Sequence, residues 1–326
     1  MKINESDLFK LLADGEFHSG QQLASAMNVS RTAIWKHLDN LRSKGVEIEA
    51  IKGKGYRLSS PIEMLDRQVI ITNLNSDAAD QLQDLQLHYQ LDSTSRLLSS
   101  RRASQSIHAS VVMAEYQTDG KGRGNNQWLT APAAGLCISI GWHFDSTPKT
   151  LTALSLATGV VLAECLTASG SVPVRLKWPN DLVYDGAKLG GILIESRGQL
   201  AGAVDVIIGI GLNIRMPSAL ATKITQRVTD LSQVFGYTPS RNQLAANIIS
   251  SMFSMLENYA VLGFETRIDK WRQLDITRGS NAILHRVGGD VSGRVVDIDE
   301  NGFLIMAVNG KLARFSSGDL SIRISN

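Results

Sequence analysis

The middle of the chain contains the stretch KWPNDLVYDGAKLGGIL at residues 177–193. Pro179 restricts the residue before it to an extended backbone, and the Asn-Asp pair that follows favours a turn. The stretch therefore predicts a strand, a tight turn and a second strand, with Lys177 and Lys188 near each other. Two lysines beside a carboxylate suit a site for a phosphate, a metal ion or both, although spacing alone favours an ordinary hairpin with surface lysines.

A second polar stretch, QTDGKGRGNN, occupies residues 117–126 and carries three glycines spaced by two. Glycine lets backbone N–H groups turn toward an anion, and Lys121 and Arg123 add positive charge. The stretch resembles a phosphate cradle, but the chain has no Gly-Lys-Ser or Gly-Lys-Thr, and the third glycine is misplaced for a Rossmann turn. A mobile surface loop explains the pattern equally well.

The central segment, roughly residues 64–270, mixes strands with helices. Buried strands are expected at 110–115, 136–140 and 204–211, and long helices at about 148–169 and 240–260. Because strands and helices do not alternate strictly, the predicted fold class is α+β with a mixed sheet. The hydroxyl-rich run Asp92-Ser93-Thr94-Ser95 either binds a small polar ligand or caps the next helix, and capping accounts for at least one of the hydroxyls.

The N-terminal 60 residues predict a compact helical unit that ends in a hairpin. Ser19 and Gln22 form a capping box at the start of a second helix, and Ser30 can cap a third helix. Two short helices joined by a tight turn are typical of a helix-turn-helix. Residues 46–51 alternate as a strand does, and a glycine turn and a return strand at 56–58 complete a wing with a cationic tip.

This winged helix predicts a DNA-binding surface. From residue 31 to residue 57 there are seven basic and three acidic side chains, concentrated on the elements that would face phosphate. The second helix of such a motif enters the major groove with its N-terminal residues near the base edges. Docking of another protein is the alternative. The candidate DNA contacts are Ser30, Arg31, Thr32, Trp35, Lys36, Lys52 and Lys54.

The last segment, from about residue 277, consists of short predicted strands at 281–284, 290–297, 302–308 and 311–315. Gly288-Gly289 and Asn309-Gly310 are expected to form hairpin turns. A small SH3-like barrel fits this pattern. We therefore predict three domains: a winged helix at 1–62, a mixed-sheet domain at 63–272 and a barrel at 273–326.

Composition is typical of a folded protein of the cytoplasm. The chain has 326 residues, 43% of them hydrophobic, and a net charge of +2 that does not by itself indicate a nucleic-acid partner. Its two cysteines, Cys137 and Cys165, lie far apart, which argues against a disulfide framework and a structural zinc site. The N-terminus does not resemble a signal peptide, and the apolar run at 151–166 is expected to form a core helix rather than a membrane span.

Taken together, these motifs resemble the bacterial biotin protein ligases of the bifunctional type, which also repress the biotin operon. The resemblance runs through almost the whole chain. Its markers are Asp92-Ser93-Thr94, Glu115-Tyr116-Gln117, the 120–123 loop with Trp128, the 177–181 and 188–193 blocks, Gly211-Leu212-Asn213 and a C-terminal run at 318–323.

The resemblance implies roles for individual residues. Biotin would be bound by Ser93, Thr94, Ser95, Gln117, Lys121, Gly122, Arg123, Lys188 and Gly191. The nucleotide would be bound by Trp128, Lys177, Asn180 and Asn213, and its magnesium by Asp181. Arg123, Lys188 and Asp181 are the implied catalytic residues, and we expect Arg123 and Lys188 to converge on one cavity.

The chain departs from the family at two places. The family often has Asn where this chain has Ser95, and its glycine loop is richer in arginine than residues 124–126. We therefore expect weaker retention of the adenylate and weaker ligand-linked dimerisation.

The implied reaction uses ATP, Mg²⁺ and biotin. Biotin and ATP give biotinyl-5'-AMP, and a lysine of a biotin carboxyl carrier protein then takes the acyl group. Both first reactants are anionic, so fixed positive charge must stabilise the transition state. The further partners implied are operator DNA and, when the adenylate is bound, a second copy of the chain, with no membrane. The alternatives are a non-catalytic ligand-sensing regulator and a lipoate-type acyl ligase.

Overall fold

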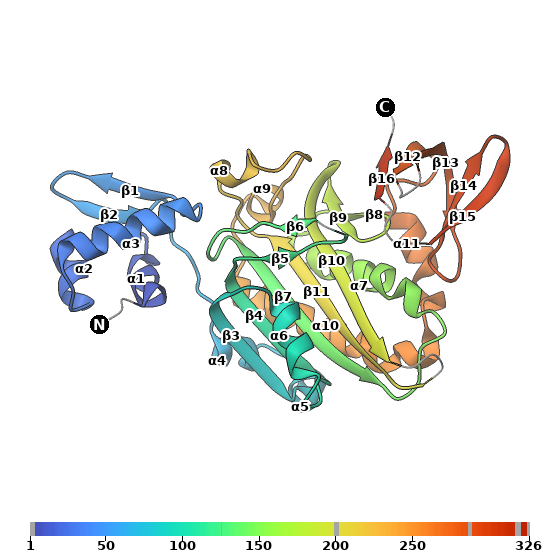
Figure 1. The fold of residues 1–326 in the computed structure, drawn as a ribbon, viewed down its shortest axis with the longest axis horizontal. Coiled ribbons are helices and arrows are strands. Elements are labelled where there is room, and N and C mark those ends of the chain that lie inside the picture. The colour runs from blue at the N-terminus through green and yellow to red at the C-terminus, as the bar shows by residue number, and fades with distance from the viewer. Residues whose placement is uncertain (1–3, 125, 199–201, 286–288, 317–320, 325–326) are drawn as a thin grey trace.

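The computed structural model describes residues 4–124, 126–198, 202–285, 289–316 and 321–324. Asn125 of the glycine loop, Gly288 of a predicted turn and residues 318–320 of the C-terminal run lie outside this part of the chain. The N-terminal unit is a winged helix, as predicted (Figure 1). It comprises α1 (Glu5–Leu12), α2 (Gly20–Ala26), α3 (Arg31–Ser43), β1 (Ile48–Ile51) and β2 (Gly55–Leu58).

The helix caps expected from the sequence are present. The Ser19 hydroxyl accepts from the backbone N–H of Gln22, and the Gln22 side chain accepts from the N–H of Ser19. Ser30 caps α3 by accepting from the N–H of Ala33 at 3.2 Å. These bonds satisfy N–H groups that a helix start leaves unpaired, so short helices form at defined residues.

The central unit is built on a seven-stranded mixed sheet in the order β3-β4-β7-β11-β10-β9-β8. The β3–β4 pair is parallel and the other neighbouring pairs are antiparallel, which confirms the predicted mixed sheet. The strands are β3 (Asp84–Leu91), β4 (Ser110–Gln117), β7 (Gly135–Phe144), β8 (Arg175–Lys177), β9 (Asp181–Tyr184), β10 (Ala187–Gly198) and β11 (Val204–Asn213).

Helices cover both faces of this sheet (Figure 1). The long helices α7 (Leu154–Gly170) and α10 (Arg241–Leu262) enclose the main apolar core, and α6 (Thr94–Arg101) covers a smaller cluster with Val112 and Ile207 on the other face. The shorter helices are α4 (Arg67–Thr72), α5 (Ser76–Gln81), η1 (Leu151–Ala153), α8 (Ser218–Ala221), α9 (Leu231–Phe235), η2 (Glu265–Arg267) and α11 (Ile268–Leu274).

One helical stretch, Leu151–Gly170, is long and apolar enough to cross a membrane by length and composition. In the structure 61% of its most apolar window is buried inside the protein. It contributes Leu156, Val160 and Leu162 to the main core, which agrees with the expected core helix.

The C-terminal unit is a five-stranded antiparallel sheet in the order β15-β14-β13-β12-β16, as expected for a small barrel. Its strands are β12 (Asn281–His285), β13 (Val291–Ile298), β14 (Leu304–Val308), β15 (Lys311–Phe315) and β16 (Ser321–Ile324). β16 is not among the strands that the sequence predicts. The boundaries at 62 and 272 stay predictions.

Candidate functional site

A cavity of about 540 Å³ lies at one end of the central sheet. It is bounded by the start of α6, the glycine loop, β10, β11 and the C-terminal unit. Arg123 and Lys188 both line it, so the two cations that the sequence analysis expected to converge do share one cavity. Among the lining residues described, Lys121, Arg123, Lys177, Lys188 and Arg323 are cationic and Asp181 is the one carboxylate. Such a cavity suits an anion.

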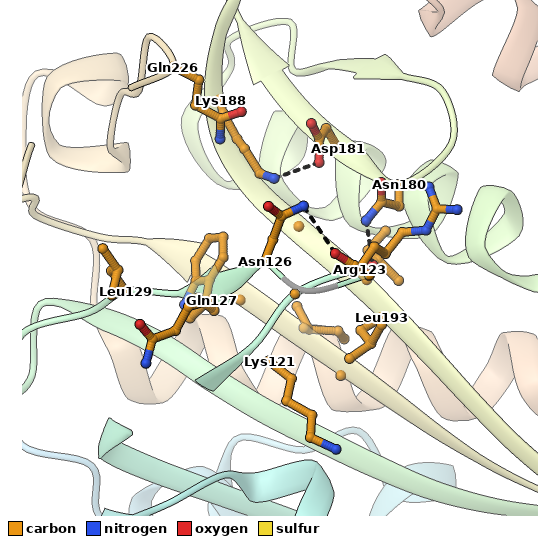
Figure 2. Close-up of a pocket in the computed structure, with 18 of the residues that line it drawn as sticks. Lys121, Arg123, Asn126, Gln127, Leu129, Asn180, Asp181, Lys188, Leu193 and Gln226 are labelled. Atoms are coloured by element: carbon orange, nitrogen blue, oxygen red, sulfur yellow. Dashed lines mark hydrogen bonds and ion pairs between the residues drawn. The ribbon is translucent and has the colours of Figure 1, made fainter. Parts of the chain in front are cut away.

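Lys188 and Asp181 form the ion pair at the centre of this cavity (Figure 2). Their Nζ and Oδ1 atoms are 2.7 Å apart, and about a fifth of each side chain is exposed. The pair forms because β9 and β10 are antiparallel, with Gly191 opposite Asp181, and a register shift occurs between Lys188 and Gly190. The turn predicted after Lys177 joins β8 to β9, and a second turn at 185–186 joins β9 to β10, so two successive hairpins bring both lysines to the cavity.

Lys177 lies next to this pair. Burial is the main factor that lowers its pKa from the ordinary lysine value, Lys188 and Arg323 lower it further, and Asp181 opposes them. Arg323 comes from β16, so the C-terminal unit adds a cation to the same cavity. A bound anion would relieve the repulsion among these three cations.

Trp128 forms one wall of the cavity. It belongs to β6 (Gln127–Trp128), which pairs with β5 (Gly120–Lys121). This short antiparallel pair joins the two ends of the glycine loop. A Cβ added at Gly211 would lie 2.5 Å from Cε2 of the indole, so the ring lies directly against the glycine backbone. The Lys188 ammonium lies 5.9 Å from the centre of the ring.

The same cavity is lined by a network of buried hydroxyls and one amide. Gln117 Oε1 accepts from the backbone N–H of Thr94 at 2.8 Å and lies 3.1 Å from its hydroxyl. The Thr94 and Ser95 hydroxyls lie 2.7 and 2.9 Å from that of Ser139, which is fully buried on β7. Ser93 caps α6, which is one of the two roles predicted for the hydroxyl-rich run. Ser139 is not among the site residues predicted from the sequence, because nothing in a buried strand marks one serine as part of a site.

The amides of Asn180 and Asn213 are engaged in holding the walls of the cavity. Asn180 Nδ2 donates to the carbonyl of Ile192 at 2.8 Å, and Asn213 Nδ2 donates to the carbonyl of Thr229 at 3.0 Å. Residues 224–226 and 228 line the cavity near Asn213. No sequence motif marks that segment as part of a site.

The glycine loop is held by hydrogen bonds between its own residues. The N–H of Gly122 donates to the carbonyl of Asn126 at 2.8 Å, and Asn126 Nδ2 donates to the carbonyl of Arg123 at 3.0 Å. Lys121 points away from Lys188 in Figure 2, and its ammonium lies 3.8 Å from a carboxylate oxygen of Glu195. The biotin contact predicted for Lys121 therefore requires either a side-chain rotation or a contact through its backbone.

The N-terminal unit presents the expected basic surface. Arg31, Thr32, Trp35 and Lys36 are exposed on α3, with 53% of Trp35 accessible, and Lys52 and Lys54 are exposed at the wing tip. Ser30 is engaged as the helix cap. Arg57, which the basic count included, lies over the ring of Phe17 and pairs with Glu49 at 2.9 Å, so part of its charge is already matched.

Family models match three parts of the chain. The biotin/lipoate A/B protein ligase family matches residues 87–213, a helix-turn-helix domain matches 4–57, and the biotin protein ligase C-terminal domain matches 283–323. The chain is 36% identical to the bifunctional ligase/repressor BirA of Salmonella typhimurium and 34% identical to that of Escherichia coli. Each match covers 97% of this chain and 96% of the relative.

Solved structures agree in fold. The biotin protein ligase of Aquifex aeolicus in complex with biotin and ATP is 23% identical and gives a TM-score of 0.62, over 75% of this chain and all of that chain. The biotin protein ligase of Leishmania major in complex with biotin is 25% identical and gives a TM-score of 0.51, over 72% of this chain and 97% of that chain.

Proposed function

Because the chain belongs to the family of bifunctional biotin protein ligases and repressors, we propose a specific role for each group of residues in the central cavity. The chain is an ATP-dependent biotin protein ligase that forms biotinyl-5'-AMP, and its N-terminal domain gives it the role of a repressor. The observation that carries the residue assignment is the convergence of Lys188, Asp181 and Arg123 with the Gln117–Thr94 network in one cavity.

The first half-reaction joins two anions. A carboxylate oxygen of biotin attacks the α-phosphorus of ATP, and the bond to pyrophosphate breaks. Lys188 and Arg123 supply the fixed positive charge that stabilises the charge developing on the phosphate oxygens. Asp181 holds the Lys188 ammonium at 2.7 Å, which fixes the position of this charge in the cavity. Pre-positioned charge is effective because it need not reorganise during the reaction.

Biotin occupies the end of the cavity with the hydroxyl network. Ser93, Thr94, Ser95 and Gln117 are buried there and already have hydrogen-bond partners in the protein, and their remaining donors and acceptors are available to the ligand. Gly122 and Gly191 let the backbone approach the ligand closely, and Lys121 contributes from the loop. A site built from polar groups rejects a ligand that cannot pair with them, so this end decides which acyl group is taken.

The nucleotide occupies the end near Trp128, Lys177, Asn180 and Asn213. Magnesium is usually bound through one or two carboxylates together with substrate phosphates. The described residues contain no group of three or more His, Cys, Asp or Glu side chains arranged to hold a metal. Asp181, the one carboxylate among the described lining residues, fits an ion that reaches the site with the phosphates. The ion would neutralise charge on those phosphates.

In the second half-reaction a lysine amine of the acceptor attacks the acyl carbon, and AMP leaves. We propose a biotin carboxyl carrier protein as the acceptor. The enzyme then needs no covalent nucleophile of its own. Closure of the glycine loop over the mixed anhydride would keep water out.

The repressor role requires binding to operator DNA by α3 and the wing. A single winged helix makes few contacts, so we propose that two copies bind together, each on one half-site, when the adenylate is bound. Because both ATP and operator DNA are found in the cytoplasm, we propose that compartment.

Pyrophosphate release from purified protein with biotin, ATP and magnesium tests the catalytic assignment. Lys188→Met should reduce the rate by about 10²–10³-fold, the range for loss of one charge-stabilising donor. Lys311→Met, at an exposed position of β15, is the matched control. Equal rates for the two variants would remove Lys188 from the mechanism, and competition by lipoate for biotin would show that the acyl specificity is broader than proposed.

A further inference from the structure

The C-terminal unit places a histidine on the wall of the central cavity. His285 is the last residue of β12, and it lines the cavity together with Arg323 of β16. In the antiparallel β12–β16 pair, Ile283 lies opposite Arg323 and His285 lies opposite Ser321, so the side chains of His285 and Arg323 share one face of this sheet. Lys177 of β8 lines the same cavity, so β8, β12 and β16 meet there (Figure 1).

An aspartate orients the imidazole of His285. Leu284 and Val291 form the last pair of the β12–β13 ladder, so His285 and Asp290 face each other where the chain turns. Asp290 Oδ2 lies 2.9 Å from Nδ1 of the ring. An ionised carboxylate only accepts, so Nδ1 carries the ring proton and Nε2 presents its lone pair. Among the residues that the structure describes, Asp290 is the one hydrogen-bond partner of this ring.

The imidazole can be reached from solvent as well as from the cavity. About 40% of the His285 side chain and 55% of the Asp290 side chain are exposed. A side chain that lines the cavity and is exposed to this degree lies at its opening. The acceptor lysine must enter the cavity from outside, because it belongs to another protein. The position of His285 therefore suits a group that acts on the incoming lysine rather than on biotin or ATP.

The second half-reaction needs a group that can take a proton. An ordinary lysine has a pKa of about 10.4, so only roughly one acceptor lysine in a thousand has a free lone pair near neutral pH. Of the cavity residues that the structure describes, Asp181 is paired with Lys188 at 2.7 Å, and the other titratable side chains apart from His285 are lysines and arginines. Imidazole is the side chain that accepts and returns protons near neutral pH.

From this geometry we propose that His285 is the catalytic base of the transfer step, and that Asp290 is its positioning residue. Nε2 takes one proton from the ammonium of the acceptor lysine, and the freed lone pair forms the N–C bond to the acyl carbon. The C–O bond to the phosphate breaks, and its electron pair leaves with AMP. A second proton passes from the new amide nitrogen to AMP or water, and His285 returns its proton to water. This inference rests on the proposed function of the cavity.

The test measures the two half-reactions separately on the purified full-length protein. Pyrophosphate release in a single turnover with biotin, ATP and magnesium reports formation of the adenylate. The loaded enzyme is then mixed with a biotin carboxyl carrier protein or with hydroxylamine, and the rate of acyl transfer to each is measured. The nitrogen of hydroxylamine is largely unprotonated at neutral pH, so its attack on the acyl carbon does not require a base.

In His285→Gln, transfer to the carrier protein should slow by about 10²–10⁴-fold, the usual contribution of a general base. Pyrophosphate release and the reaction with hydroxylamine should change much less. His143→Gln is the matched control. His143 also pairs through Nδ1 with an aspartate, Asp205, at 2.7 Å, and 39% of its side chain is exposed, but it is not among the residues that line the cavity. This control should transfer biotin at the wild-type rate.

Asp290→Asn is a second variant, in which the amide can donate to Nδ1 and hold the ring in the wrong tautomer. It should also slow transfer to the carrier protein more than the reaction with hydroxylamine. Wild-type transfer in either variant, or equal slowing with carrier protein and hydroxylamine, would overturn the proposal. So would a change only in the carrier concentration that gives half the maximal rate, because it would make His285 a docking residue. Absence of pyrophosphate release from the wild type would instead refute the proposed ligase function.

Discussion

Replacing Gly211 with alanine tests the contact between the sheet and the indole of Trp128. Gly211 lies on β11 opposite Gly191 of β10. A methyl group at Gly211 would place its carbon 2.5 Å from Cε2 and 2.8 Å from Cζ2 of the indole. Carbon atoms in ordinary contact are about 3.5–4.0 Å apart, so the ring must move by roughly 1 Å.

The cost follows from this overlap. Inserting a methyl group into a packed position typically costs about 1–3 kcal/mol. If Trp128 lines the adenine side, displacing it removes that free energy from nucleotide binding, and the KM for ATP should rise by roughly 5- to 150-fold. The KM for biotin is measured separately, because Trp128 lies close to Gln117: a Cβ added at Gly120 would lie 2.6 Å from the Trp128 carbonyl oxygen and 3.0 Å from Gln117 Nε2.

The assay is pyrophosphate release with ATP varied at saturating biotin, then with biotin varied at saturating ATP. Gly20→Ala is the matched control, because its methyl group would meet its nearest atom, in Tyr56, at an ordinary 3.5 Å. The rise in the KM for ATP should be smaller when Trp128 is also replaced by phenylalanine, since the smaller ring relieves the overlap. An unchanged KM for ATP, or an equal rise in both backgrounds, would refute the reasoning.

Three further perturbations follow from the structure. Arg241→Met should lower the free energy of unfolding in urea by about 3–5 kcal/mol, because it leaves the buried Glu115 carboxylate without its cation. The control Arg227→Met removes a cation from an exposed pair and should lower it by less than about 1 kcal/mol. Equal losses of stability in the two variants would contradict this prediction. Because the pKa of Lys177 is lowered, its positive charge is present below that pKa and is lost as the pH rises through it. The KM for ATP should therefore begin to rise at a pH below that at which an ordinary lysine loses its proton. Arginine keeps its charge, so the same rise in Lys177→Arg would exclude this explanation. Trp35→Ala combined with Lys36→Ala should weaken DNA binding in a gel shift and leave pyrophosphate release intact, whereas a parallel loss of both would mean that the two activities do not reside in separate domains.

Local physics made several elements predictable from the sequence. Ser19 and Ser30 start helices because a hydroxyl satisfies N–H groups only three residues away. The turn between β8 and β9 follows from Pro179 and the residues after it. Lys188 meets Asp181 across the next hairpin, β9–β10, which turns at Asp185 and Gly186. The family motifs then indicated the biotin ligase and its candidate site residues, and those residues line one cavity.

Contacts between distant segments could not be predicted in this way. Ser139 reaches Thr94 across 45 positions, and Arg323 joins the cavity only because the C-terminal sheet is placed beside it. Lys44, at the end of helix α3, contacts Gln90 and Tyr116 on two strands whose sequences carry no mark of the contact. Arg241 and Glu115, 126 positions apart, form a buried pair for the same reason. The sequence by itself determined the caps, the turns and the chemistry of the motifs, because these depend on near neighbours. Only the tertiary structure decided which cations share a cavity and how the winged helix meets the ligand-binding strands, because both depend on how separate surfaces pack.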